Sequence, residues 1–404
     1  MHIGLFSPGW PVNEFTNGIV TYVHNLRREL LAQGHRVSVF TNQIGQSNLD
    51  SGIHRVHHTA AFRASGRVKR LLNRRYHHVF AWGKMIASTV NAVHHVDPID
   101  ILEMEESFGW CATVQQRVPF PVVVKLHGPA FLTLVDEDRE SALSSAKIDA
   151  EGSALRRIRT VISPSAETLQ KTVSNYALKP EISEIIPNPV IADDSLQPWN
   201  IENCDRKTLL FVGRFDKPKG GDAVLTAFRK LLDTDSSLRL VFVGPDSGLT
   251  SPSGERIFFE QFRDRLFEPD LRKQVEFLGR QPRERLHELR NRAMLTLVLS
   301  RWENQPNTAL EAMIQGCPVV GFGGGGMDEV IEHGSTGLLS PAGDLDTLCR
   351  LVLEVVNHAP IAMRLGAEAR RVIANRHAAK DLAAKTLELY TRSIEMRAAT
   401  GSCT

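Results

Sequence analysis

Two glutamates eight residues apart are the clearest candidates for ligand chemistry in this sequence of 404 residues. Glu303 follows an apolar stretch, 294–299, that predicts a buried strand, and Glu311 lies about two helical turns further on, near the start of a predicted helix. The loop between them is therefore expected at the carboxyl end of a strand, where open α/β sheets bind ligands. Carboxylates on both sides of an anion site suit a nucleotide sugar, which carries phosphates between a ribose and a hexose. The helix amides that we expect to bind phosphate belong to Asn307, Thr308 and Ala309.

Segment 300–313 resembles the Glu-x7-Glu motif of glycosyltransferase family 4, whose members are retaining enzymes with the GT-B fold. The resemblance covers roughly residues 207–345, with its parts in the same order and at similar spacing. Its remaining parts are a phosphate-binding turn at 211–222, two strands at 240–244 and 275–279, and two glycine-containing segments at 323–331 and 334–339. The N-terminal half matches more loosely.

The alternation of apolar strands with helical patterns predicts two α/β domains, which the chain length also favours. We place the hinge in the proline-containing segment 186–199. Together with the resemblance, this pattern implies GT-B architecture, in which two Rossmann-like parallel-sheet domains face each other across a cleft. The expected parts are an acceptor-side domain (1–190), a nucleotide-sugar-binding domain (191–378) and a helix returning to the first domain (379–397). The expected strands of the first half are His2–Phe6, Arg36–Thr41, Ile99–Glu103, Val122–Leu126 and Thr160–Ser163, and a second series begins at Thr208.

Arg214 and Lys219 stand at the basic positions of the family's phosphate-binding turn. Cleavage of a nucleotide sugar builds negative charge on the diphosphate, which must be stabilised by a divalent metal or by fixed cations. No Asp-x-Asp triplet occurs in a plausible context, so we predict that these two side chains act without metal. The alternative is that both are ordinary solvated cations.

The resemblance assigns Glu311 to the ribose hydroxyls and Glu303 to hydroxyls of the donor sugar. Many family members carry Gly-Phe-Gly after the first glutamate, whereas this chain has Asn304-Gln305-Pro306-Asn307. Because Pro306 has no N–H, amide contacts to the sugar are expected from Asn304 and Gln305. The alternative role for Glu311 is stabilisation of the positive helix N-terminus.

Two residues of the first half are candidates for the same reaction. Gly18 precedes a helix with one apolar face, and we expect its backbone to approach the leaving phosphate. The family usually has two glycines there, and Asn17 takes the place of the first. His127 follows a strand of valines, and the resemblance implies that it contacts the donor sugar near the reacting carbon. The alternatives are a glycine that only begins the helix and a structural histidine.

The acceptor is poorly defined by the sequence. Glu105, Glu106 and Trp110 follow a predicted strand and suit hydroxyl binding and sugar stacking, but an acidic first helical turn explains them equally well. The stretch Arg63–Arg75 holds six cations and no acid, interleaved with apolar residues. A solvated helix face is one interpretation. The other is docking on an anionic membrane that carries a lipid-linked acceptor.

Composition excludes several classes of protein. The 48 Lys and Arg nearly balance the 46 Asp and Glu, so no global field favours nucleic acid. Five scattered cysteines show no metal-binding spacing and indicate reduced thiols. The sequence lacks an apolar run long enough to span a membrane and begins directly with a predicted strand, so we expect a cytoplasmic protein, with peripheral membrane association as an option.

These observations predict a retaining, metal-independent hexosyltransferase that needs no cofactor beyond its nucleotide-sugar donor, with UDP favoured over GDP. The expected acceptor is a hydroxyl of a glycan or lipid-linked glycan in cell-envelope or exopolysaccharide synthesis. Two alternatives stay open, namely a nucleotide-sugar epimerase of GT-B fold and a non-catalytic nucleotide-binding subunit. A dinucleotide dehydrogenase is disfavoured because Gly-x-Gly-x-x-Gly is missing after the first strand. The sequence does not indicate an oligomeric state.

Overall fold

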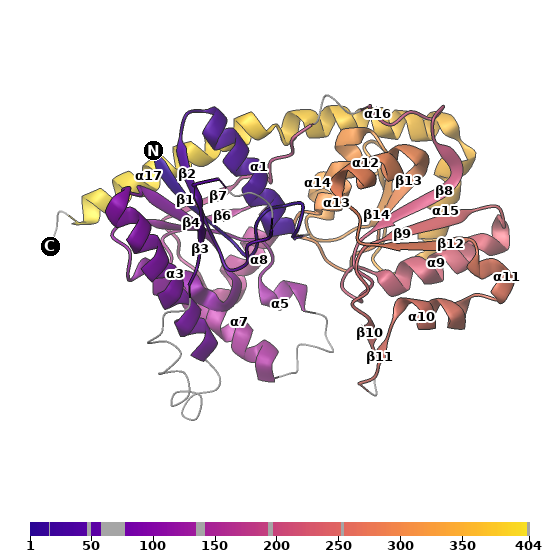
Figure 1. Ribbon diagram of the computed structural model, residues 1–404. Helices are drawn as coiled ribbons and strands as arrows, with labels where there is room; N and C mark the ends of the chain where they lie inside the picture. The colour runs from indigo at the N-terminus through magenta and orange to yellow at the C-terminus, as the bar shows by residue number, and fades with distance from the viewer. Residues whose placement is uncertain are drawn as a thin grey trace. The chain divides into compact units, whose positions relative to one another are not determined.

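The computed structural model describes residues 1–15, 17–46, 50–57, 77–134, 142–192, 197–251 and 254–401. The chain divides into two compact units. The N-terminal unit comprises Met1–Pro189 and His377–Thr404, and the C-terminal unit comprises Val190–Arg376 (Figure 1). Each unit contains its own parallel sheet, and each is described separately below.

The sheet of the N-terminal unit has seven strands, all paired in parallel, in the order β3-β2-β1-β4-β5-β6-β7. The order reverses between β1 and β4, which makes this pair the topological switch point of a Rossmann-like sheet. The strands are β1 (His2–Ser7), β2 (Arg36–Thr41), β3 (Ile53–Arg55), β4 (Ile101–Glu105), β5 (Val122–Lys125), β6 (Thr160–Ser163) and β7 (Ile182–Ile185).

Helices cover both faces of this sheet. Because successive side chains of a strand point to opposite faces, Ile3 and Leu5 of β1 pack with α1 and α17, whereas Phe6 packs on the face covered by α3, α4 and α7. The helices are α1 (Gly18–Ala32), α3 (His77–Val96), α4 (Trp110–Gln115), α5 (Ala130–Thr133), α7 (Ala142–Leu155), α8 (Ala166–Tyr176) and α17 (Ala379–Gly401), and η1 (Ser107–Gly109) is a short 3-10 helix.

The sheet of the C-terminal unit has six parallel strands in the order β12-β9-β8-β13-β14-β15, with its switch point between β8 and β13. A small antiparallel pair, β10 and β11, stands apart from it. The strands are β8 (Asp205–Val212), β9 (Arg239–Val243), β10 (Leu249–Thr250), β11 (Arg256–Ile257), β12 (Val275–Gly279), β13 (Ala293–Val298), β14 (Val319–Phe322) and β15 (Leu338–Ser340).

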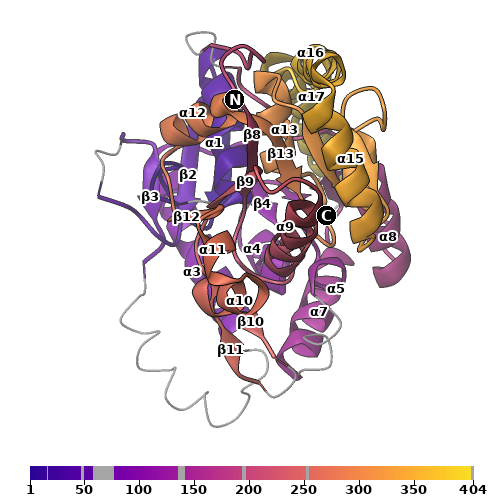
Figure 2. The same ribbon diagram turned by 90° about the vertical axis from the view of Figure 1, so that its right-hand side faces the viewer.

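One large apolar core fills the C-terminal unit between its sheet and its helices. Figures 1 and 2 show α12, α13 and α16 on one face of the sheet and α9 with α10 on the other. Helices α13 and α16 approach closely, since a Cβ at Gly366 would lie 2.1 Å from the Gly316 carbonyl oxygen. The helices are α9 (Gly221–Thr234), α10 (Phe259–Leu266), α11 (Pro269–Arg272), α12 (Arg283–Arg292), α13 (Asn307–Gln315), α14 (Met327–Val330), α15 (Leu345–Asn357) and α16 (Ala359–Arg376).

The strands expected from the sequence are present, with small shifts at their ends. The strand expected at Ile99–Glu103 runs from Ile101 to Glu105, because Asp100 accepts a hydrogen bond from the His2 amide and pairing with β1 begins only at Ile101. The sequence patterns missed β3 and β7. Both are edge strands of three or four residues whose side chains are mostly half-buried or exposed, so they lack a continuous apolar signal.

Candidate active site

The candidate residues of the C-terminal unit lie at its switch point. The turn after β8 carries Arg214 and Lys219, and the loop after β13 carries Glu303. Because β8 and β13 are neighbours in the sheet, their carboxyl ends bring the turn and the loop together. Gly220 makes this approach possible. Its φ is +76°, and a Cβ there would lie 2.0 Å from the Leu299 carbonyl oxygen.

The basic side chains of the turn are held by carboxylates. The Arg214 Nε lies 2.6 Å from Oδ2 of Asp216, whose other oxygen accepts a hydrogen bond from the Lys219 amide at 2.8 Å. The Lys219 Nζ donates to Oε1 of Glu303 at 2.5 Å. Both cations remain solvent-accessible, with 53% of the Arg214 side chain and 37% of the Lys219 side chain exposed. The structure therefore places the predicted phosphate-binding lysine beside the predicted sugar-binding glutamate.

Glu303 is positioned by its own loop and by a run of glycines. Its Oε1 also accepts from the Ser300 hydroxyl at 2.6 Å, and its carbonyl oxygen accepts from the Gly326 amide at 2.7 Å. A Cβ at Gly326 would lie 1.5 Å from the Asn304 carbonyl oxygen. The glycine run 323–326 thus lets the backbone after β14 lie directly against the Glu303 loop.

Helix α13 begins at Asn307, with Pro306 as its N-cap residue, as expected from the sequence. Asn304 is buried, whereas Gln305 is half-buried. The Thr308 hydroxyl donates to the Val212 carbonyl oxygen at 3.3 Å, which ties the first turn of α13 to the end of β8. The predicted phosphate-binding amides therefore start next to the β8 turn.

Glu311 is held by arginines of α12. The Arg290 guanidinium donates to Glu311 Oε2 at 2.5 Å, and Arg283 lies 4.0 Å from Oε1. Arg290 is buried, whereas about a quarter of the Glu311 side chain is exposed. A charge-assisted contact to a buried guanidinium fixes the Glu311 carboxylate in place.

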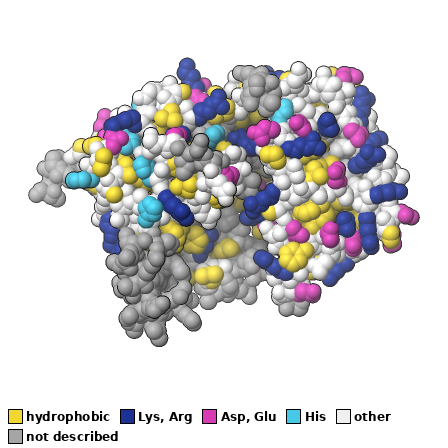
Figure 3. All heavy atoms as spheres, in the orientation of Figure 1, with side chains coloured by type: hydrophobic (Ala, Val, Ile, Leu, Met, Phe, Trp, Pro, Cys, Tyr) yellow, Lys and Arg dark blue, Asp and Glu magenta, His cyan; other side chains and the backbone are white. Residues whose placement is uncertain are grey.

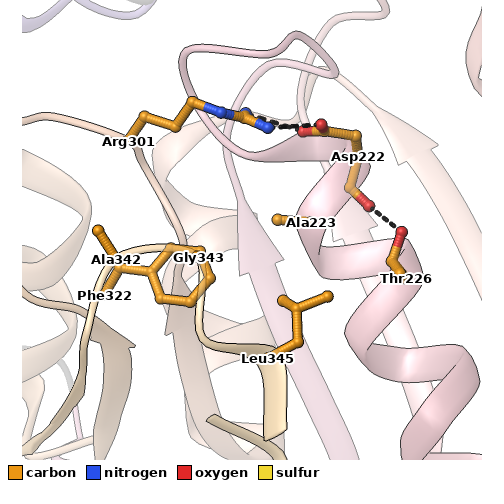
Figure 4. A pocket seen from close by; sticks show the side chains of 8 residues that line it. All are labelled: Asp222, Ala223, Thr226, Arg301, Phe322, Ala342, Gly343 and Leu345. Carbon is orange, nitrogen blue, oxygen red and sulfur yellow. Dashed lines mark hydrogen bonds and ion pairs between the residues drawn. The ribbon is translucent and has the colours of Figure 1, made fainter. Parts of the chain in front are cut away.

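Arg301 joins the two loops of this site. Its amide donates to the Pro218 carbonyl oxygen at 3.0 Å, and its guanidinium donates to the Lys217 carbonyl oxygen. The same guanidinium bonds both oxygens of Asp222, in the first turn of α9, at 3.0 and 2.6 Å. Figure 4 shows this bidentate pair beside a cavity of about 330 Å³ lined by Asp222, Ala223, Thr226, Arg301, Phe322, Ala342, Gly343 and Leu345.

In the N-terminal unit, the loop after β1 leads into α1, which begins at Gly18. The Asn17 side chain caps this helix by accepting a hydrogen bond from the Ile19 amide at 2.8 Å. Asn17, which replaces the first glycine of the family pattern, therefore has a local structural role. Gly18 is exposed at the start of the helix.

His127 follows β5 in a loop that two buried carboxylates hold. Glu106 accepts hydrogen bonds from the His127 amide at 2.9 Å and the Gly128 amide at 2.7 Å, and Glu151 accepts from the Ala130 amide at 2.7 Å. Burial, together with the nearby charge of Glu106, raises the pKa of Glu151 to about 8. Desolvation, followed by the charge of Lys125, lowers the pKa of His127 to about 3, so its imidazole is neutral at neutral pH.

The structure gives the predicted acceptor residues buried positions. Glu106 is fully buried with both oxygens directed at the backbone amides of the His127 loop. Glu105 is also buried, and burial followed by the charge of Glu106 raises its pKa to about 7. Trp110 packs into the core, where it contacts Phe6 edge-on at 6.0 Å and stacks on Phe108 at 5.0 Å between ring centroids. The geometry therefore makes Glu106 a support of the His127 loop.

The basic stretch Arg63–Arg75 lies outside the described residues, so membrane docking stays a prediction.

The described part of the chain contains no cluster of three or more His, Cys, Asp or Glu side chains suited to a metal ion. Within the same ranges, no helix is both long and apolar enough to cross a membrane. On the face shown in Figure 3, the Lys and Arg side chains of the C-terminal unit lie among Asp and Glu side chains. The described surface of the C-terminal unit on that face therefore lacks the one-sign patch typical of nucleic-acid-binding proteins.

Two family models match consecutive parts of the chain. Glycosyltransferase Family 4 matches residues 16–194, and Glycosyl transferases group 1 matches residues 195–372. The chain belongs to glycosyltransferase family 4. This glycosyltransferase is 26% identical over 401 residues to a D-inositol 3-phosphate glycosyltransferase of Streptomyces scabiei (strain 87.22), covering 93% of this chain and 86% of that protein.

Solved structures show the same fold as this glycosyltransferase. Sucrose-phosphate synthase (tll1590) from Thermosynechococcus elongatus matches 97% of this chain and 98% of its own, with a TM-score of 0.75 and 19% identity. Anabaena Alr3699/HepE in complex with UDP-glucose matches 96% of this chain and 99% of its own, with a TM-score of 0.70 and 16% identity. The predicted GT-B fold is confirmed.

Sequence reasoning missed three residues that organise the glycosyltransferase site. Asp216 and Arg290 bind the predicted site residues Arg214, Lys219 and Glu311, and Arg301 joins their loops. Asp216 stands within the phosphate-binding turn, so its position between two cations was an available signal. No sequence signal distinguished Arg290 or Arg301, because most arginines of a helix or loop are solvated.

Arg301→Ala should lower kcat/KM for the donor about tenfold, equivalent to about 1.4 kcal/mol, because the turn that carries Lys219 loses its anchor to the Glu303 loop. Arg301→Lys should recover only part of this loss, since an ammonium cannot bond Asp222 in the bidentate manner of a guanidinium. Steady-state kinetics with varied donor provides the measurement.

The matched control is Arg229→Ala, which removes a guanidinium of α9 that pairs with Asp233 on the exposed face of the helix. We expect kinetics close to wild type for this variant. Wild-type kcat/KM in Arg301→Ala would show that the two loops keep their arrangement without the contacts of Arg301.

Proposed function

We propose that this glycosyltransferase transfers a hexose-type sugar, with retention of configuration, from a nucleotide diphosphate to a hydroxyl acceptor without a divalent metal. The observation that carries the proposal is the contact of Lys219 with Glu303 at the β8–β13 switch point. A cation and a carboxylate side by side suit the point where a diphosphate meets a hydroxyl-rich sugar.

The two cations supply the leaving-group chemistry. An ammonium has three donors, so Lys219 can keep its bond to Glu303 while it binds a phosphate oxygen. The Arg214 guanidinium, which is half exposed, can bond two phosphate oxygens in its fork geometry. Charge that develops on the β-phosphate would thus be stabilised by groups that are already oriented.

The carboxylates fit the two sugar rings of the donor. Both hydrogen bonds that described residues make to the Glu303 carboxylate involve Oε1, so its second carboxylate oxygen can accept from a hydroxyl of the transferred sugar. Glu311, fixed by Arg290, is assigned to the ribose hydroxyls. Between them lies the start of α13, whose N-terminus favours phosphate. UDP is the favoured nucleotide and GDP the next, and the likeness to Anabaena Alr3699/HepE in complex with UDP-glucose supports this order.

A same-face substitution is the mechanism that these groups support best. Glu303 is bonded by Lys219 and Ser300, which suits sugar binding better than attack on the anomeric carbon. The leaving phosphate would then accept the proton of the acceptor hydroxyl. His127, neutral at neutral pH, is assigned to contact with the donor sugar, and Gly18 at the start of α1 to the leaving phosphate.

A screen of UDP-, GDP- and ADP-sugars tests the proposal. We expect one donor, a UDP-sugar first, to raise the melting temperature and to be hydrolysed slowly, both in excess EDTA. NMR of the transfer product should show the anomeric configuration of the donor. A product of inverted configuration, an epimerised donor, or activity that EDTA abolishes would contradict the mechanism.

Lys219→Ala and Arg214→Ala should each lower kcat a hundredfold or more, because loss of one charge-assisted contact in the transition state costs about 2–4 kcal/mol. Because 53% of the Arg214 side chain and 37% of the Lys219 side chain are exposed, the melting temperature should change little. The control is Lys230→Ala, which removes an exposed ammonium of α9 that pairs with Asp346. Turnover near wild type in either site variant would reject the assignment.

We further propose a glycan or lipid-linked acceptor of cell-envelope or exopolysaccharide synthesis, reached by docking of Arg63–Arg75 on anionic lipid. The protein should then bind vesicles that contain acidic lipid, and salt should release it, because exposed charges are screened within about 8–10 Å. The triple variant Arg67→Glu, Arg70→Glu and Arg74→Glu should abolish vesicle binding and keep nucleotide affinity. Absence of vesicle binding by the wild-type protein at low salt would reject membrane docking and favour the interpretation of this stretch as a solvated helix face.

A further inference from the structure

A group of buried polar side chains lies beneath the His127 loop in the N-terminal unit, and the reaction proposed above does not use it. Its members are Tyr22 of α1, Glu103 of β4, Lys125 of β5 and Tyr390 of α17. All four are at most 3% exposed, although two of them carry ionisable carboxyl and amino groups. Buried charges are costly unless they are paired, so such a group calls for a functional explanation.

Tyr22 contacts two members of this group, Glu103 and Lys125. Its hydroxyl donates to Glu103 Oε1 at 2.8 Å, and the Lys125 Nζ lies 4.8 Å from the centroid of its ring. Lys125 is in turn held by a hydrogen bond of 2.5 Å to the Ile186 carbonyl oxygen. The Tyr22 ring also contacts the imidazole of His127, at 5.0 Å between centroids and an interplanar angle of 67°.

This edge-on contact gives the imidazole a defined orientation. The Glu106 carboxylate fixes the His127 backbone through the amides of His127 and Gly128 but does not determine the side-chain torsions. A rigid aromatic surface beside the ring restricts those torsions, because aromatic pairs prefer offset or edge-on geometries. Backbone and side chain of His127 are thus held by two separate sets of buried groups.

We propose that Tyr22 is a positioning residue whose aromatic ring orients His127 for the transfer reaction. The inference rests on the proposed role of His127 at the donor sugar. It adds a function for a tyrosine of α1 that does not itself touch the substrate.

The second tyrosine of the group provides a matched control. Tyr390 donates its hydroxyl to the other oxygen of the same carboxylate, Glu103 Oε2, at 2.9 Å. Tyr22→Phe and Tyr390→Phe therefore each remove one O–H···O bond from one buried glutamate. They differ because only residue 22 has a ring against His127.

The test compares these variants with Tyr22→Leu and His127→Ala. Tyr22→Leu should lower kcat at least tenfold with a donor KM within about twofold of wild type, whereas Tyr22→Phe and Tyr390→Phe should both keep kcat within about twofold. In the His127→Ala background, Tyr22→Leu should cause no further loss of kcat, because a positioning residue acts through the group that it positions. Additive losses in the double variant would overturn the inference.

A spectroscopic readout covers the case in which Tyr22→Leu folds poorly. With 13C-labelled histidine, the His127 ring protons should show a ring-current shift that persists in Tyr22→Phe and disappears in Tyr22→Met. An unchanged shift in Tyr22→Met would overturn the inference. Wild-type kcat in His127→Ala would instead overturn the role of His127 in the proposed function, and this inference with it.

Discussion

The contact between the β8–α9 turn and the loop after β13 is the constraint on which the candidate donor site depends. Parallel strands that are adjacent in the sheet bring their carboxyl ends together, but the distance between the loops is set by local contacts. Gly220 permits backbone contact, Arg301 ties both loops to Asp222, and the ion pair of Lys219 with Glu303 closes the arrangement. Without this contact, the cation and the carboxylate would belong to two independent surface loops.

The ion pair also explains how opposite charges can serve one anionic ligand. A carboxylate beside a phosphate site would repel the donor if it stood alone. Because Lys219 balances its charge, Glu303 can accept a hydrogen bond from a sugar hydroxyl at little electrostatic cost. Arg290 balances the charge of Glu311 in the same way. The carboxylates of the site are therefore paired with cations on the protein itself. Arg214 is likewise paired with Asp216 but keeps half of its side chain exposed, and the proposed function assigns it to the phosphates. This charge balance underlies the proposal of metal-independent transfer.

In the N-terminal unit, the neutral His127 lies close to several buried carboxyl groups, which need hydrogen-bond partners. Glu106 and Glu151 bind backbone amides of the His127 loop, and Glu103 binds two tyrosine hydroxyls. Buried carboxyl groups of this kind are satisfied by hydrogen bonds from neutral donors. The raised pKa of Glu151, about 8, and the lowered pKa of His127, about 3, are consequences of the same burial.

The sequence was sufficient to predict the fold, because apolar strands and amphipathic helices leave a periodic signal and the switch-point loops carry family motifs. It also named Lys219 and Glu303, but as separate residues. The sequence could not predict the contact between Lys219 and Glu303 or the hydrogen bonds by which Arg301 joins the two loops, since both depend on loop conformation. Glu106 shows the limit most clearly. Its partners are backbone amides, which have no sequence signature, so the sequence suggests only an acceptor residue or an acidic first helical turn.

Hydrogen–deuterium exchange with and without UDP tests the central claim most directly. If the diphosphate binds at the β8–β13 switch point, saturating nucleotide should protect the amides of residues 213–221 and 300–311 in the C-terminal unit. Within that unit, the outer strands β12 and β15 should exchange as before. Protection confined to other parts of the C-terminal unit, with exchange unchanged in both of these segments, would contradict the account.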